Sequence, residues 1–475
     1  MSEFIPPFPP RPSSSLSQWQ RLKLARRNLL AFWEEEAYEY DFVATRILAR
    51  HVFILNSPES VQFAFSTHND AYERKSPQQR HSLGPILGDG IFVSDGDTWR
   101  RRRRIVAPIV HISRLSEFAP VMVAAAAETR DRWAKLDPDV EIDALAEMAH
   151  LTAEIICRTV FGRQLGHDHA HEIVEAFSEY QRRIDPVDIM SLLGLPDWLP
   201  RWRSAAVRRS VERLHAVIDS IIASHRARRN TDEVSVIGRL LDARDEATGE
   251  PLTSEAMRNE AASLFLAGHE TTANTLAWIW YLLSEAPDVE ARLHAELDLV
   301  LAGRLPTLGD MPQLVYTRAV VEETLRLYPP VPMMAREAVK DETFQDHHIP
   351  KGSLMILSPW LLHRHRRLWK KPDHFIPERF LSGSGEPVSK FAYVPFSVGP
   401  RICAGLAFGM TEAVLSLATL AQSAVLRMKA SERVEAECRL TLRPGKTLPM
   451  HVHRRGVAPR TGSAPTTTGC PFAHA

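Results

Sequence analysis

The sequence predicts a mainly helical protein with a small β-sheet region, because helical apolar periodicity dominates the chain and strand-like runs are few and short. The 475 residues contain no internal repeat and no shift in composition that would divide them. A Pro-rich stretch opens the chain, and a stretch rich in Pro, Thr and Gly closes it. We therefore expect an N-terminal arm at 1–12, one large domain at 13–455 and a flexible tail at 456–475.

Helical patterns occupy several long segments, and strand patterns occupy short runs rich in Val, Ile and Leu. The predicted helices are 117–136, 142–161, 205–228, 253–285, 288–301 and 406–421. The predicted strands are 52–55, 354–357 and 450–453. The helix at 253–285 is too long and too apolar to lie on the surface, so we expect it at the centre of the domain.

Composition bounds the class of protein. Hydrophobic residues make up 44% and charged residues 24% of the chain, which is typical of a soluble globular protein. The formal net charge is zero, so nothing indicates a nucleic-acid partner. The four cysteines (Cys157, Cys403, Cys438 and Cys470) are widely spaced, which favours a reducing cytoplasm over disulfides. No signal peptide or long apolar run is evident, so we expect a cytoplasmic protein without a stable membrane anchor.

The most informative segment is the decapeptide 396–405, Phe-Ser-Val-Gly-Pro-Arg-Ile-Cys-Ala-Gly. It places Cys403 just before a helix, where the dipole and free N–H groups favour a thiolate. Arg401 adds positive charge, and Gly399 and Gly405 let the backbone approach a flat ligand. These are the requirements of an axial thiolate ligand to haem iron. A lone cysteine is more often simply buried in a helix, but the surrounding pattern favours the ligand.

A second unusual segment lies in the middle of the long helix: Ala267-Gly268-His269-Glu270-Thr271-Thr272. A carboxylate and two hydroxyls are costly in a buried helix. Gly268 weakens the helix, and the Thr271 hydroxyl can compete for a carbonyl one turn earlier, so we expect local widening. Alone, Glu270 and Thr271 would be read as a polar pair on a helix surface.

Both segments resemble signatures of the cytochrome P450 family: Phe-x-x-Gly-x-Arg-x-Cys-x-Gly at 396–405 and Ala-Gly-x-Glu-Thr-Thr at 267–272. The resemblance implies the cytochrome P450 fold, with haem b between the long central helix and the helix after Cys403. It implies Cys403 as the iron ligand. It also implies that Thr271 and Glu270 deliver the two protons that dioxygen needs before its O–O bond breaks heterolytically.

Further motifs match scaffold signatures of the same family. Glu323-Thr-Leu-Arg326 matches the Glu-x-x-Arg helix, and 377–380 matches the Pro-Glu-Arg-Phe segment. By resemblance, Glu323, Arg326 and Arg379 form a buried salt-bridge cluster behind the cysteine loop. We assign this cluster to folding and haem retention rather than catalysis.

Cations suited to the haem propionates come from three segments. Trp99 and Arg103 lie four residues apart on one helix face and match Trp-x-x-x-Arg. Arg336 and Arg401 are similarly placed by resemblance, and a guanidinium binds a carboxylate with two hydrogen bonds. The other arginines of the run, Arg100, Arg102 and Arg104, are expected to face outward. With Lys370 and Lys371 they would form a positive docking patch for an acidic electron donor.

The resemblance implies a monooxygenase that inserts one oxygen atom of O2 into an apolar molecule, such as a fatty acid, terpenoid or steroid-like compound. Electrons would come from NAD(P)H through a separate ferredoxin or flavodoxin-type donor and its reductase, because no dinucleotide fingerprint follows Cys403. The protein is expected to be a monomer. The alternatives are a peroxide-driven peroxygenase and a non-catalytic haem sensor or carrier.

The expected substrate pocket is apolar, with Phe265, Ala267, Val331, Met333 and Met334 prominent. The segments expected to form it are 84–93, 189–202, 261–271, 330–335 and 446–450. Segment 189–202 is interrupted by glycine and proline, so it is either a packed loop or a lid over the entrance.

Two weaker features receive no role. His363, His365 and His374 are expected to be exposed loop histidines without a metal. The dipeptide Cys470-Pro471 in the tail is too short to indicate a function.

Overall fold

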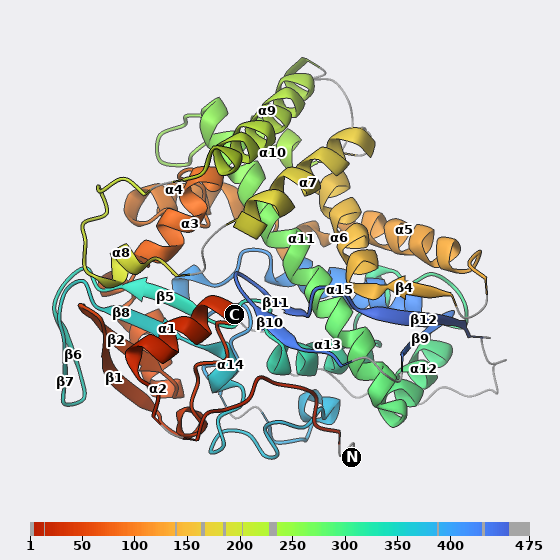
Figure 1. Ribbon diagram of the computed structural model, residues 1–475. Coiled ribbons are helices and arrows are strands. Elements are labelled where there is room, and N and C mark those ends of the chain that lie inside the picture. The colour runs from red at the N-terminus through yellow and green to blue at the C-terminus, as the bar shows by residue number, and fades with distance from the viewer. Residues whose placement is uncertain are drawn as a thin grey trace.

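The computed structural model describes residues 4–13, 15–137, 140–162, 167–183, 187–201, 203–227, 235–386, 389–429 and 433–455. The chain folds into a helical body with small sheets beside it (Figure 1), so the prediction of a mainly helical fold with a small β-sheet region is confirmed. The tail from residue 456 on, with Cys470-Pro471, lies outside the described residues.

The α-helices follow one another along the whole body. They are α1 (Gln18–Arg27), α2 (Pro58–Gln62), α3 (Pro77–Leu87), α4 (Gly96–Val106), α5 (Leu115–Trp133), α6 (Ala144–Val160), α7 (His167–Arg183), α8 (Ile189–Leu192), α9 (Ala205–Ala227), α10 (Val236–Asp242), α11 (Ser254–Glu285), α12 (Pro287–Leu301), α13 (Val315–Leu327), α14 (Pro359–Leu362) and α15 (Leu406–Ala421). Each predicted helix is present within a few residues. The start of α6 is later than predicted, because residues 141–143 pair as a strand instead.

The strands form a five-stranded sheet, a three-stranded sheet and two hairpins. They are β1 (Phe42–Ile47), β2 (Arg50–Leu55), β3 (Arg74–Lys75), β4 (Glu141–Asp143), β5 (Met334–Glu337), β6 (Glu342–Phe344), β7 (His347–Ile349), β8 (Leu354–Leu357), β9 (Ala424–Met428), β10 (Ala436–Cys438), β11 (Leu442–Pro444) and β12 (Pro449–Arg454). The larger sheet has the order β1-β2-β8-β5-β3, and β2 and β8 pair in parallel.

The central helix α11 runs diagonally through the body and packs on α6, α9, α13 and α15 (Figure 1). Its first turn is capped by Thr253, whose hydroxyl accepts a hydrogen bond from the Ala256 N–H. Apolar residues surround the helix almost completely, which explains its burial. No helix among the described residues is long and apolar enough to cross a bilayer.

The Pro-rich N-terminal arm packs against the body. The Tyr328 hydroxyl donates to the Pro7 carbonyl (2.6 Å), and the Phe375 N–H donates to the Phe4 carbonyl (3.1 Å). Arg11 forms two hydrogen bonds with Asp373 and stacks on the Tyr38 ring. Residues 4–11 thereby cover the loop region that follows α14.

Candidate functional site

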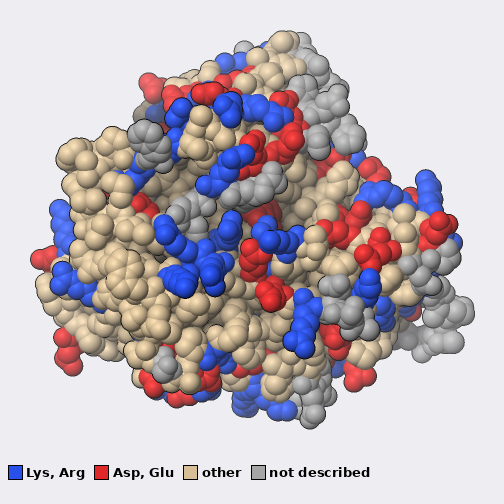
Figure 2. All heavy atoms as spheres, in the orientation of Figure 1, with Lys and Arg blue, Asp and Glu red and all other residues tan. Residues whose placement is uncertain are grey.

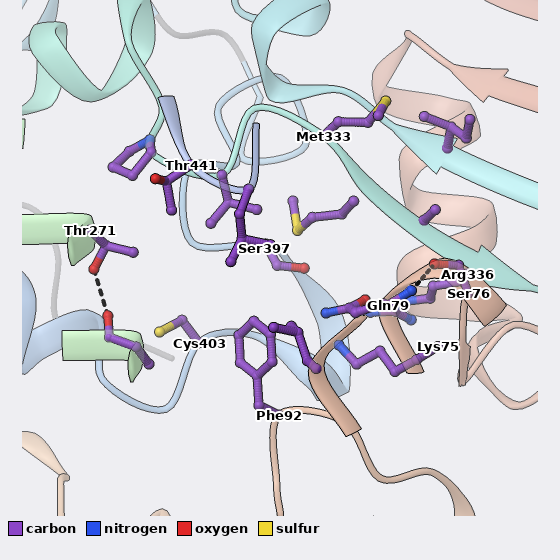
Figure 3. Close-up of a pocket in the computed structure, with 18 of the residues that line it drawn as sticks. Lys75, Ser76, Gln79, Phe92, Thr271, Met333, Arg336, Ser397, Cys403 and Thr441 are labelled. Carbon is purple, nitrogen blue, oxygen red and sulfur yellow. Dashed lines mark hydrogen bonds between the residues drawn. The ribbon is translucent and has the colours of Figure 1, made fainter. Parts of the chain in front are cut away.

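A cavity of about 760 Å³ lies between α11 and the cysteine loop and extends outward to α1 and β1. Its walls are mostly apolar. In the close-up of Figure 3, Thr271 of α11 and the pair Lys75 and Arg336 lie toward opposite ends of the view, with Cys403 between them. Figure 2 shows few charged side chains over β1, β2 and α8, on the same side of the molecule as the outer part of the cavity.

The cysteine loop is held by its own backbone. The Cys403 N–H donates to the Phe396 carbonyl (2.9 Å), and α15 begins three residues after Cys403. Gly399 adopts a φ of +75°, and a Cβ there would lie 1.9 Å from the Phe65 carbonyl oxygen. Only glycine therefore allows the loop to pack this closely on the neighbouring segment. Gly399 does not line the cavity, whereas Phe396, Arg401, Cys403 and Gly405 do.

The accessible surface of Cys403 belongs to the cavity wall, although the residue lies deep in the molecule. Burial raises the pKa of the Cys403 thiol, while a hydrogen bond from the Gly405 N–H and the charge of Arg103 lower it. Burial outweighs the helix-terminus effect that the sequence suggested. A cation bound at the sulfur would reverse this balance, because a coordinating thiol is deprotonated outright.

Four cations border the cavity near its cysteine side: Lys75, Arg103, Arg336 and Arg401. Burial lowers the pKa of all four, and the charges of Arg401 and Arg336 lower that of Lys75 further. The pKa of Arg336 falls to about 9. Several buried positive charges close together are stable only when anions lie nearby. Asp95 supplies one, at 2.9 Å from Arg401.

Lys75 was not predicted from the sequence as a site residue. Its ammonium lies 5.7 Å from the centre of the Phe92 ring, and it follows Arg74 in a two-residue strand that gives no helical signal. Trp99 and Arg103 both line the cavity, as their spacing on one helix face requires. Arg336 donates to the Asn69 side chain (2.7 Å) and lies over the Phe65 ring.

Thr271 lines the cavity, and its hydroxyl donates to the Ala267 carbonyl at 2.6 Å (Figure 3). The helix runs unbroken from Ser254 to Glu285, so the expected widening does not interrupt it. Glu270 does not line the cavity. Its charge adds to burial in raising the pKa of the Cys438 thiol, which places the carboxylate toward β10.

A buried ion cluster lies behind the cysteine loop. Arg326 forms two hydrogen bonds with Glu323 (2.6 and 2.8 Å), and Arg379 lies 3.4 Å from the same carboxylate. The remaining Arg326 donors reach backbone carbonyls of 363, 372 and 374. All three charged side chains are buried. The cluster therefore ties α13 to the chain that leads into the cysteine loop.

The histidine prediction was wrong for His363 and His365, which are fully buried. The His363 Nε2 accepts a hydrogen bond from the Val394 N–H (2.9 Å), and its Nδ1 lies 3.2 Å from the Arg326 carbonyl. His363 thus satisfies two buried backbone groups between the ion cluster and the cysteine loop. No group of residues suited to a metal ion occurs among the described residues.

The predicted substrate pocket is only partly matched. Ala267, Val331, Met333 and Met334 line the cavity, but Phe265 does not; its ring packs on Phe177 and His269 instead. Segment 446–450 is absent from the lining, and residues 439–441, in the β10–β11 turn, take its place. Of segments 84–93 and 189–202, the described lining residues are Ile91, Phe92, Ser191 and Leu192.

The predicted positive docking patch is also corrected. Arg102 is buried against Asp89 and Glu260 and does not face outward. Arg100 and Arg104 are exposed, but each lies beside an acid: Arg100 beside Glu73 and Asp97, Arg104 beside Asp245. Neighbouring carboxylates therefore offset much of the charge expected on this face.

These residues fit one kind of cofactor. A thiol on the wall, apolar surroundings and a group of cations short of anions suit a flat apolar ring that carries two carboxylates and a metal. The residues around the cavity therefore fit haem.

The comparisons with known proteins agree. The family model for Cytochrome P450 matches residues 6–447. The chain therefore belongs to the cytochrome P450 family and is a haem-dependent monooxygenase, a class that uses O2 and redox partners.

Cyclooctatin synthase of Streptomyces melanosporofaciens is 34% identical over 84% of this chain and 85% of that protein. Cyclooctat-9-en-7-ol 5-monooxygenase of the same organism is 32% identical over 72% and 73%. A crystal structure of the cytochrome P450DA heme domain covers 96% of this chain and 99% of that chain with a TM-score of 0.79. Its identity is 24%, so it supports the fold alone.

Proposed function

We propose that the protein hydroxylates a terpenoid-like apolar substrate with O2, using haem b and electrons from NAD(P)H delivered by a separate ferredoxin or flavodoxin-type donor and its reductase. The observation that carries the proposal is one apolar cavity bordered by both Cys403 and Thr271. The two Streptomyces relatives are named for cyclooctatin and cyclooctat-9-en-7-ol, which favours a terpenoid over a fatty acid.

Each group near the cavity has a distinct task in this proposal. The Cys403 thiolate holds the iron, and Trp99, Arg103, Arg336, Arg401 and Lys75 receive the two propionates. Haem, when bound, supplies the oxygen activation and accepts the electrons. Val331, Met333 and Met334 exclude water and orient the substrate through apolar contact.

Proton delivery is assigned to Thr271 and Glu270. The Thr271 hydroxyl donates to Ala267 in the resting protein and can redirect this proton toward the cavity by a rotation of its side chain. Glu270, at the preceding position of the helix, reprotonates the site from the β10 side. The acid–alcohol pair favours the O2-dependent reaction over a peroxide-driven one, which needs no external protons for O–O cleavage.

The test of the reaction uses the haem-loaded protein with a ferredoxin and its reductase, NADPH and ¹⁸O2. Candidate terpenoids are chosen by their ability to shift the haem absorption band. We expect a product that has gained one labelled oxygen atom. Turnover with hydrogen peroxide but not with O2 and reductant would support the peroxygenase, and ligand binding without turnover under either condition would support a sensor.

Replacing Thr271 by Ala should lower the product formed per NADPH by up to roughly 100-fold, the lower end of what one proton-transfer group contributes, and should raise hydrogen peroxide correspondingly. Thr324→Ala is the matched control. Its hydroxyl makes the same bond to a carbonyl one turn earlier (2.8 Å), but it lies on α13 away from the cavity. Equal coupling in both variants would remove Thr271 from the proton pathway.

A further inference from the structure

The loop between α3 and α4 reaches the cavity through Ile91 and Phe92. We call residues 88–93 the α3–α4 loop. Phe92 also lies beside Lys75, so the loop borders both the apolar part of the cavity and its cationic end. A displacement of this loop would change the shape of the cavity where a substrate contacts it.

A buried carboxylate of α11 holds the loop. Glu260 of α11 is 0% exposed, and both of its oxygens accept from the Ile91 N–H, at 3.1 and 3.2 Å. It does not line the cavity. A fully buried carboxylate on a long apolar helix destabilises the fold unless it is paired and hydrogen-bonded. The hydrogen bonds from the Ile91 N–H therefore help to offset the cost of burying Glu260.

Arg102 of α4 completes the contact. Its side chain is 9% exposed, and its Nε lies 3.3 Å from Glu260. Its Nη2 donates to both oxygens of Asp89 in the loop, at 2.9 and 2.8 Å, and the Asn259 amide donates to the same carboxylate at 2.9 Å. Charged groups from α4, α11 and the loop therefore meet in one cluster, in which Arg102 is hydrogen-bonded to Asp89 and forms an ion pair with Glu260.

The backbone of the loop lies so close to α11 that side chains are excluded at two positions. A Cβ at Gly90 would lie 2.4 Å from the Ser263 Oγ and 2.8 Å from the Asn259 carbonyl oxygen. A Cβ at Gly88, where φ is +53°, would lie 2.2 Å from the Asn259 amide nitrogen. The close fit gives the loop one position against α11 rather than a range of positions.

We propose that Glu260 and Arg102 are positioning residues that clamp the α3–α4 loop to α11, and that this clamp determines which apolar molecules the cavity accepts and where they are oxidised. Neither residue lines the cavity, and both act through Ile91 and Phe92. The choice of a terpenoid rests on the proposed function, but the clamp requires only that ligands enter this cavity.

The pairing predicts a non-additive result. Glu260→Gln keeps an acceptor for the Ile91 N–H, and Arg102 keeps Asp89 as a carboxylate partner. Arg102→Gln removes a cation that lowers the pKa of Glu260, which burial raises to about 7, so the buried acid takes up a proton and accepts from the Ile91 N–H more weakly. Because either change alone already breaks the contact between Glu260 and Arg102, the double variant should lose less than the sum of the two single losses.

The test compares Glu260→Gln, Arg102→Gln and the double variant as haem-loaded proteins. Arg100→Gln is the control, since Arg100 lies on the same helix but is exposed and contacts Glu73 and Asp97 instead of the loop. The probe is 4-phenylimidazole, titrated by its effect on the haem absorption band. Hydrogen exchange of peptides that cover 88–94 is measured in parallel, because it reports on the loop without any turnover.

We expect each single variant to bind the probe about tenfold more weakly, a change equal to one charged hydrogen bond, and to exchange faster at 88–94. The double variant should lose less of both properties than the two single losses added together, and Arg100→Gln should match the wild type. For any substrate that is turned over, the ratio of its oxidised products should change in both single variants and should stay at the wild-type value in Arg100→Gln.

Unchanged probe affinity and unchanged exchange at 88–94 in both single variants would overturn the clamp. So would losses in the double variant that equal the sum of the two single losses. Failure of the proposed terpenoid chemistry gives a different pattern, in which no terpenoid is oxidised while probe affinity and loop exchange still follow the clamp.

Discussion

The two sides of the cavity are held by different means. Behind Cys403, buried groups with several short hydrogen bonds each, such as Arg326 and His363, join α13 to the cysteine loop. At the expected entrance, segment 187–201 is held to α3 and β3 by partly exposed ion pairs. The cysteine side is therefore built to stay fixed, and the entrance is built from contacts that water can replace.

Asp197 is the centre of the entrance contacts. Its carboxylate is 30% exposed and lies beside Arg74 (3.2 Å), Arg80 and His81 (3.3 Å). The same arginines also reach Glu337 of β5, which Arg50 contacts from β2 at 3.1 Å. This network joins the sheet and α3 to segment 187–201 beside the cavity, a contact that fits both the lid and the packed-loop interpretation of this segment.

The largest effect is expected on the cysteine side. Arg326→Met leaves Glu323 buried without its main partner and should destabilise the protein by about 3–5 kcal/mol. Soluble yield, haem content per chain and the thermal unfolding midpoint measure it. Arg318→Gln on the same helix should be near wild type, because the Arg318 side chain is 59% exposed in its i,i+4 pair with Glu322. Equal behaviour of the two variants would contradict the contrast between the two sides.

An intermediate effect is expected from acid. Burial lowers the pKa of His363 to about 3, far below its value in an unfolded chain. Below pH 6.5 the unfolded chain binds a proton that the folded protein excludes, so stability falls as pH falls. Between pH 7 and pH 5 this one group should cost about 2 kcal/mol.

Urea unfolding of the wild type, His363→Gln and His348→Asn at both pH values checks this effect. His348 is exposed on β7 and serves as the control. His363→Gln should start less stable but lose less stability on acidification than the other two proteins. An equal loss in all three would show that His363 does not contribute to the acid sensitivity.

The smallest effect is expected at the entrance. Asp197→Asn should speed the association and dissociation of a large apolar ligand up to about fivefold, the range of an exposed ion pair, and leave the unfolding midpoint unchanged. At 1 M salt, where the Debye length is about 3 Å, the variant and the wild type should converge. Stopped-flow ligand binding measures the rates, with Asp131→Asn on α5 as a surface control. Rates that differ equally at low and high salt would contradict an electrostatic latch.

The same contrast explains what the sequence could predict. The bounds of α15 and the end of α11 follow from apolar periodicity and a stopping Pro287, and the cysteine loop follows from a short motif. Such features are encoded within a few residues. The replacement of 446–450 by 439–441 in the cavity wall was not predictable, because it depends on how the β10–β11 turn meets α11.

The wrong predictions for Arg102 and Phe265 could have been avoided, because the sequence contained a pattern that indicated the correct placement of each. Arg102 lies three residues after the buried Trp99, so it shares a helix face with it, and Asp89 and Glu260 supply the charges that allow its burial. On α11, Leu264, Ala267 and Thr271 form a cavity-facing stripe of period three to four. Phe265 lies off this stripe and joins the aromatic packing behind it.

The most direct test of the proposed site is to determine which residue binds the iron. In the reduced, carbon monoxide-bound protein we expect the red-shifted Soret band of a thiolate-ligated haem. Cys403→Ala should lose this band, whereas Cys157→Ala and Cys438→Ala should keep it, because both of these thiols are buried away from the cavity. A Cys403→Ala protein that retained the band would contradict the assignment of Cys403 and, with it, the site described around the cavity.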